Sequence, residues 1–205
     1  DSAVSSTQNL LQEAQSIAQL EHPHIVTVYN VGEEGGLFYI EMQLILGQPL
    51  NHVLRDQDLP TERIIRLLTE LASALDHAHE RGVIHRDIKA ENVLVSDDGS
   101  ARLVDFGLSQ IDQESLKKMR AFNGLDSDDS EQPIADQSKY SRSGTPAYMA
   151  PEFWLKGEAG VSTDLYAFGV MAYLMYEGNL PFKGSSWHEV MEAHLDHPPE
   201  PLSEQ

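Results

Sequence analysis

Three short stretches, far apart in the sequence, decide how this chain is interpreted. Residues 85–92 read HRDIKAEN, residues 105–107 read DFG, and residues 144–152 read GTPAYMAPE. The first stretch lies between a helical pattern and a predicted hairpin, and the second directly follows a strand-like run. Each stretch is weak by itself, since a DFG can be a simple turn after a strand. Together and in this order they are a far more specific signal.

The surrounding pattern predicts a mixed framework of helices and short strands. Apolar residues at helical spacing predict helices over residues 10–18, 61–81, 163–177 and 186–195. Runs of β-branched and aromatic residues predict strands over residues 25–31, 37–45, 93–95 and 101–104. The helix over residues 163–177 is apolar nearly all round, which predicts that it is buried. Residues 111–140 lack an apolar anchor, and we expect a mobile loop there.

The chain is strongly acidic, because 14 basic and 33 acidic residues give a formal net charge of −19. Such a chain repels phosphate backbones and anionic lipid headgroups, so we expect neither nucleic acid nor membrane surfaces as partners. The charge could attract basic peptides, or it could serve only solubility or adaptation to salt. The chain has no Cys, which excludes a disulfide framework and fits a reducing, cytoplasmic location.

The length of 205 residues suffices for one large domain or two small lobes. No apolar run approaches the roughly 20 residues that a membrane-spanning helix needs. The first ten residues are polar and include no Met, so we expect no signal peptide. We also expect the chain to be an excerpt of a longer protein, which could be anchored to a membrane elsewhere.

The three stretches resemble those of the eukaryotic-type (Hanks-type) serine/threonine protein kinases, and residues 79–85, HERGVIH, are similar to the bacterial members. The resemblance implies an α+β, protein-kinase-like bilobal fold. A partial small β lobe would occupy residues 1–45, and a partial, mostly helical large lobe residues 46–205. It further implies ATP and Mg²⁺ as cofactors and a protein or peptide substrate.

The resemblance also assigns chemical roles within the first two stretches. Asp87 would be the catalytic base, since a carboxylate on this loop can orient a hydroxyl group and accept its proton. Lys89 would place its ammonium group near the transferred phosphoryl group. Asn92 and Asp105 would hold the metal ions, because their oxygens are hard ligands suited to Mg²⁺.

Other positions match the part of the family fold that binds the nucleotide. Met42 matches the gatekeeper, Gln43 and Ile45 belong to the hinge whose backbone would bond adenine, and Leu94 would lie beneath the adenine ring. Glu13 matches the helix glutamate that pairs with a strand lysine, although it could be a solvated carboxylate. Four side chains would form a stack that links the two lobes, and Asp164 would hold the lower end of this stack. The four are Ile17, Val28, His85 and Phe106.

Regulation is predicted from Arg86, which precedes the catalytic Asp and could anchor a phosphate group on a nearby loop. The resemblance places activating phosphates near Ser138, Ser141 and Ser143, just before the third stretch. Thr145 is the less favoured site, because its hydroxyl would be occupied beside Asp87. Alternatively, the three serines are only solvated loop residues.

The sequence also departs from the family pattern. It contains no G-x-G-x-x-G, and no Lys precedes Lys89, so we expect the chain as given to be inactive. The last Arg is Arg142, although Glu152 normally pairs with an Arg from a late helix. An unpaired edge in the small lobe could support a dimer.

Three functions remain open from the sequence. The first is an ATP-dependent protein serine/threonine kinase, whose specificity rests on Lys89 and Thr145. The second is a pseudokinase or docking module, which would not need Asp87, Lys89, Asn92 and Asp105 together. The third is a small-molecule kinase, to which Lys89 and residues 144–152 are foreign.

Overall fold

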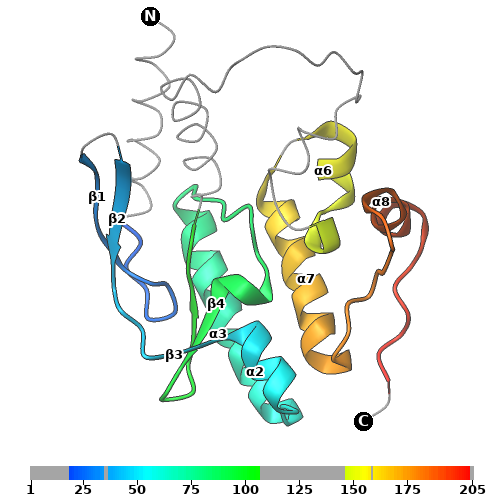
Figure 1. The fold of residues 1–205 in the computed structure, drawn as a ribbon, viewed down its shortest axis with the longest axis horizontal. Helices are drawn as coiled ribbons and strands as arrows, with labels where there is room; N and C mark the ends of the chain where they lie inside the picture. Colours follow the sequence, from blue (N-terminus) through cyan, green and yellow to red (C-terminus); the bar gives the residue numbers. More distant parts are fainter. Residues whose placement is uncertain (1–18, 35–36, 107–145, 158, 204–205) are drawn as a thin grey trace, which may run out of the picture.

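The computed structural model describes residues 19–34, 37–106, 146–157 and 159–203. Two long helices, α3 (Thr61–Glu80) and α7 (Val161–Glu177), lie side by side in its middle. A β-hairpin lies to one side of this pair, and helix α8 (Trp187–Asp196) lies to the other (Figure 1). None of the described helices is both long and apolar enough to cross a membrane.

Helix α3 forms because its apolar residues recur every three to four positions, which puts them on one face. That face is buried and consists of Ile64, Leu67, Leu71, Ala74, Leu75 and Ala78. The helix stops before Gly82, which adopts φ +73°, a left-handed conformation that costs a glycine little. The predicted helix over residues 61–81 is therefore confirmed.

The strands form two small antiparallel sheets. Strands β1 (Val28–Glu34) and β2 (Leu37–Met42) form the hairpin, with a β-bulge between Val28 and Asn30. The second sheet has the order β3 (Gly47–Pro49), β4 (Val93–Ser96), β5 (Ala101–Leu103). The segment before β1 joins the sheets, since the Val26 amide donates to the Leu103 carbonyl at 2.9 Å.

Shorter helices complete the described chain. They are α2 (Leu50–Asp56), η1 (Ala90–Asn92), η2 (Pro146–Tyr148) and α6 (Pro151–Lys156). The predicted helix over residues 186–195 is confirmed as α8, whose N-terminus is capped by the Ser186 hydroxyl, which accepts from the Glu189 amide at 3.2 Å. The predictions did not include α2, α6, η1, η2 or β3.

The prediction that residues 163–177 are buried all round is wrong in part. Helix α7 buries Ala167, Val170, Met171 and Met175, but Leu165 is 55% exposed. One face of the helix packs against α3 and η2, and Leu165 lies outside that packed face. An apolar pattern around a helix therefore does not by itself fix how many neighbours the helix has.

An aromatic cluster joins α6, α7 and α8. His194 of α8 is only 4% exposed, and its ring lies 4.5 Å from that of Phe182 and 5.7 Å from that of Tyr166. Trp154 of α6 lies 6.4 Å from the same ring. Burial lowers the pKa of His194 to about 4, so its imidazole is neutral at physiological pH.

We expect His194 to make the stability of the protein sensitive to acid. The unfolded imidazole has a pKa near 6.5 and binds protons below that pH, whereas the folded one stays neutral down to about pH 4. The free energy of unfolding should therefore decline as pH falls from 6.5 to 4, by up to about 3 kcal/mol from this group. Urea unfolding across this range, compared with His194→Gln, measures the contribution. Equal slopes in the two proteins would contradict it.

Candidate active site

The loop before β4 gathers three of the predicted site residues around one carboxylate. Oδ2 of Asp87 lies 2.6 Å from Nζ of Lys89 and accepts a hydrogen bond from Nδ2 of Asn92 at 2.9 Å. The same Nδ2 also donates to the Asp87 carbonyl at 2.8 Å. Two charged or polar partners therefore hold the Asp87 side chain in place.

Asn92 is oriented by these contacts. Because its amide nitrogen donates to Asp87, its Oδ1 oxygen is the end left for another ligand. The Asn92 carbonyl accepts from the Val104 amide at 3.0 Å, which brings the residue after Val104, Asp105, to the same end of the sheet. Asn92 and Asp105 are thus linked through the backbone.

Asp105 is held in an unusual backbone conformation, with φ +62°, which costs a residue with a side chain about 1 kcal/mol or more. Although the residue retains exposed surface, partial loss of hydration raises the pKa of its carboxyl group, and the Asp87 carboxylate raises it further. Two carboxylates that repel one another form an arrangement that a cation would neutralise.

Asp164, at the start of α7, anchors the loop of residues 85–92. This carboxylate is 1% exposed and accepts hydrogen bonds from the backbone amides of His85 and Arg86, both at 2.8 Å. Its Oδ2 also lies 2.8 Å from Nε2 of His79 in α3. Arg86 has φ +70°, so the buried carboxylate stabilises a strained turn directly before Asp87.

His85 connects this loop to the DFG stretch. Its ring lies 4.5 Å from that of Phe106, and Nε2 donates to the Val104 carbonyl at 2.9 Å. A carbonyl can only accept, so Nε2 carries the proton and Nδ1 accepts from the Asp87 amide at 3.3 Å. Burial lowers the pKa of His85, which favours this neutral form.

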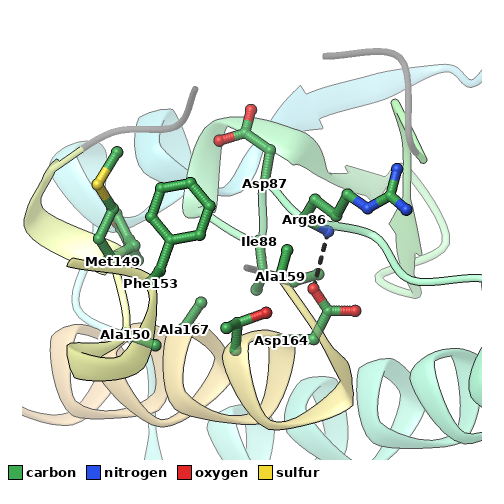
Figure 2. A pocket seen from close by; sticks show the side chains of 11 residues that line it. Arg86, Asp87, Ile88, Met149, Ala150, Phe153, Ala159, Asp164 and Ala167 are labelled. Carbon is green, nitrogen blue, oxygen red and sulfur yellow. Dashed lines mark hydrogen bonds between the residues drawn. The ribbon is translucent and has the colours of Figure 1, made fainter. Parts of the chain in front are cut away.

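A small cavity of about 30 Å³ opens beside Asp87. Figure 2 shows Met149 and Phe153 on one side of it and Arg86 with Asp164 on the other. The Asp87 carboxyl group points away from α7, and the Arg86 guanidinium points away from Met149 and Phe153. The loop of residues 85–92 and the stretch after residue 145, which are far apart in sequence, are therefore neighbours in space.

Of the predicted nucleotide-binding residues, Met42 and Leu94 lie in the two sheets, and Gln43 and Ile45 lie on the segment that joins β2 to β3. The amide of Gln43 donates to the Thr27 carbonyl at 2.8 Å, so this amide is not available to a nucleotide. The Ile45 amide makes no backbone hydrogen bond within the described residues. Leu94 lies in β4 opposite Pro49 and Arg102, and Met42, at the end of β2, is 38% exposed.

Several predicted positions lie outside the described residues. These are Glu13 and Ile17, the loop over residues 111–140, and the regulatory candidates Ser138, Ser141, Ser143 and Thr145. Within the described residues, no three His, Cys, Asp or Glu side chains converge as a metal site. The metal prediction therefore depends on Asp105 together with an amide oxygen, that of Asn92.

Sequence reasoning missed the part that His79 plays. The structure gives His79 a buried partner, Asp164, 85 positions later in the sequence. The one available signal was its place in the last turn of α3, six residues before His85.

Comparison with known proteins identifies the family. The sequence model of the protein kinase domain family matches residues 1–202. The chain belongs to the protein kinase family. The fold described above, small antiparallel sheets next to a mostly helical body, is the α+β bilobal arrangement of a kinase domain, as the three sequence stretches predicted.

Curated bacterial relatives are similar over nearly the whole chain. It is 32% identical over 194 residues to serine/threonine-protein kinase pkn2 of Myxococcus xanthus, covering 93% of this chain and 21% of that protein. It is 33% identical over 202 residues to the DNA damage-responsive serine/threonine-protein kinase RqkA of Deinococcus radiodurans, covering 96% and 28%. For PknA of Mycobacterium tuberculosis the identity is 32% over 196 residues, covering 93% and 41%. The chain thus spans about a fifth to two fifths of these relatives' lengths.

Proposed function

We propose that this protein is an ATP-dependent protein serine/threonine kinase, which transfers the γ-phosphoryl group of ATP to serine or threonine hydroxyl groups of protein substrates. The observation that carries the proposal is the Asp87 carboxylate, held by Lys89 and Asn92 beside a cavity. The names of the relatives, serine/threonine-protein kinases, support the same activity. A docking module without transfer would not need this constellation and is not favoured.

In the proposed mechanism Asp87 acts as the general base. Its carboxylate would accept the proton of the substrate hydroxyl as the oxygen attacks phosphorus. Lys89 lies within 2.6 Å of that carboxylate, where its ammonium group can also stabilise negative charge on the transferred group. The hydrogen bond from Asn92 fixes the orientation of the base before the substrate arrives.

The residues present fit Mg²⁺ and ATP. Asp105 and Oδ1 of Asn92 are hard oxygen donors, and the repulsion between Asp105 and Asp87 favours a cation there. When bound, Mg²⁺–ATP supplies the phosphoryl group and the charge that balances it. The Gln43 carbonyl and the Ile45 backbone would bond adenine, and Met42 and Leu94 would contact its ring. Glu13 matches the glutamate that pairs with a strand lysine in the family, and no Lys before Lys89 offers that partner in this sequence.

We expect Asp105→Asn to weaken binding of Mg²⁺–ATP about tenfold or more, because a neutral amide replaces a charged ligand. Isothermal titration with a non-hydrolysable ATP analogue, with and without Mg²⁺, measures this effect. The loss should appear only when Mg²⁺ is present. Equal affinities of the variant and the wild type in Mg²⁺ would contradict the assignment of Asp105.

We also propose that phosphorylation before residue 144 activates the protein. A phosphate on Ser138, Ser141 or Ser143 adds about −1.5 to −2 charge units, which the guanidinium of Arg86 could bind with paired hydrogen bonds. Replacement of all three serines by Ala should lower kcat at least about tenfold. In an Arg86→Ala background the triple change should have little further effect. Full activity of the triple variant would show that Arg86 is structural.

The remaining expectations concern domains, partners and location. We propose a small lobe over residues 1–45 and a large lobe over residues 46–205. We also propose that two copies pair through the small lobe, which sedimentation would detect. The net charge of −19 favours basic peptide substrates over nucleic acid or membrane surfaces. A cytoplasmic location agrees with ATP as the phosphoryl donor, and cell fractionation tests it.

A further inference from the structure

His194 is a buried titratable side chain that the proposed chemistry does not use. It lies in α8, 4% exposed, and Nδ1 is 2.7 Å from the hydroxyl oxygen of Tyr166 in α7. Phe182 and Trp154 pack near its ring, at centroid distances of 4.5 and 6.4 Å. The hydrogen bond and the neighbouring aromatic rings therefore orient the buried imidazole.

This cluster contacts the segment that forms one wall of the cavity beside Asp87. The indole nitrogen of Trp154 donates to the Met149 carbonyl at 3.1 Å, in a buried hydrogen bond. The other ring nitrogen of His194, Nε2, is buried, and the Ala147 carbonyl faces it without the geometry of a hydrogen bond. Helix α8 thus contacts η2, residues 146–148, whereas α6 reaches the Met149 carbonyl through Trp154. Met149 lines the cavity.

We propose that His194 is a positioning residue for the protein substrate, which, with Tyr166, holds residues 146–150 in the shape that receives the peptide beside Asp87. This inference rests on the proposed function, since it concerns how that same site accepts its substrate. The Tyr166–His194 hydrogen bond fixes the ring between α7 and α8. The ring then lies against the backbone at Ala147, and Trp154 binds the Met149 carbonyl.

The neutral imidazole suits this position better than other side chains. It carries one donor and one acceptor on opposite edges of a flat ring, so it can bond Tyr166 with one nitrogen and approach the Ala147 carbonyl with the other. An apolar ring such as Phe would leave the Tyr166 hydroxyl without this partner. A charged side chain would be destabilising among the aromatic rings, because the charge would lose its hydration.

The test compares three single variants and the double variant Tyr166→Phe/His194→Gln of the full-length protein in a steady-state peptide phosphorylation assay. Tyr166→Phe removes only the hydroxyl group that bonds His194, and His194→Gln removes the ring. His188→Gln is the matched control, since His188 lies on the same helix with its side chain 68% exposed. Peptide KM, ATP KM and kcat are measured separately for each protein.

We expect Tyr166→Phe and His194→Gln each to raise the peptide KM about fivefold or more, the effect of one lost hydrogen bond. The ATP KM and kcat should stay within about twofold, and His188→Gln should match the wild type. The double variant should be no worse than His194→Gln alone, because both changes break one contact. A fall in kcat with an unchanged peptide KM would show a merely structural role and overturn the inference.

Hydrogen exchange provides a readout that does not depend on activity. The Met149 amide donates to the Pro146 carbonyl at 3.2 Å, and its exchange should be faster in Tyr166→Phe than in the wild type or in His188→Gln. Unchanged exchange would overturn the positioning role by itself. A wild type that phosphorylates no peptide under any condition would instead contradict the proposed function, and the two failures are therefore distinguishable.

Discussion

Replacement of Asp87 by Asn should lower kcat for peptide phosphorylation by at least about 100-fold, the usual contribution of a general base, and leave the Kd for Mg²⁺–ATP nearly unchanged. The amide has the shape of the carboxylate and can still accept the hydrogen bond from Asn92. It has no basic oxygen, however, and it loses the ion pair with Lys89. The effect therefore belongs to the chemical step rather than to nucleotide binding.

The matched control is Asp97→Asn, the same chemical change at an exposed position in the turn between β4 and β5. It should leave kcat, peptide KM and ATP affinity unaltered. A radiolabelled phosphate assay gives the rates, and calorimetric titration gives the ATP affinities. If Asp87→Asn retained more than about a tenth of the wild-type kcat, Asp87 could not be the base.

Removal of the Asp164 carboxylate should have the largest effect on stability. Asp164→Ala leaves three groups without their acceptor, namely the amides of His85 and Arg86 and the ring of His79. Each unsatisfied buried donor costs about 1–3 kcal/mol, so we expect a loss of about 3–5 kcal/mol in the free energy of unfolding. Arg86, at φ +70°, would also be free to leave its strained conformation.

Urea unfolding followed by tryptophan fluorescence measures this loss as a lower midpoint at an unchanged slope. Asp196→Ala, which removes an exposed carboxylate from the end of α8, should change the free energy of unfolding by no more than about 0.5 kcal/mol. If Asp164→Ala also changed the free energy of unfolding by no more than about 0.5 kcal/mol, the buried carboxylate would not hold the catalytic loop.

The helices with strong patterns could be predicted from sequence. Helix α3 has a regular apolar stripe and ends at a glycine, and α8 begins with a serine cap, so local rules suffice for both. The hairpin over residues 93–103 is equally local. Strand β3 escaped prediction because it consists of three residues and includes Pro49. Its pairing depends on Gly47, where a Cβ atom would lie 2.2 Å from the Val95 carbonyl oxygen.

The site itself was only partly predictable. The spacing of Asp87, Lys89 and Asn92 is local, so a sequence motif captures it, and the structure brings the three together. The contact of His79 with Asp164 joins residues 85 positions apart. The contact of Tyr166 with His194 joins two helices. Neither leaves a periodic or compositional trace, because only the packing of α3, α7 and α8 creates them.

The most direct measurement is phosphoamino acid analysis of a peptide substrate after incubation of the full-length protein with radiolabelled ATP and Mg²⁺. We predict label on serine or threonine and none on tyrosine. Labelling should be faster with a basic than with an acidic peptide. No label should appear when Asp87→Asn replaces the wild type. Bound ATP with no label on serine or threonine of any protein or peptide would contradict a protein serine/threonine kinase.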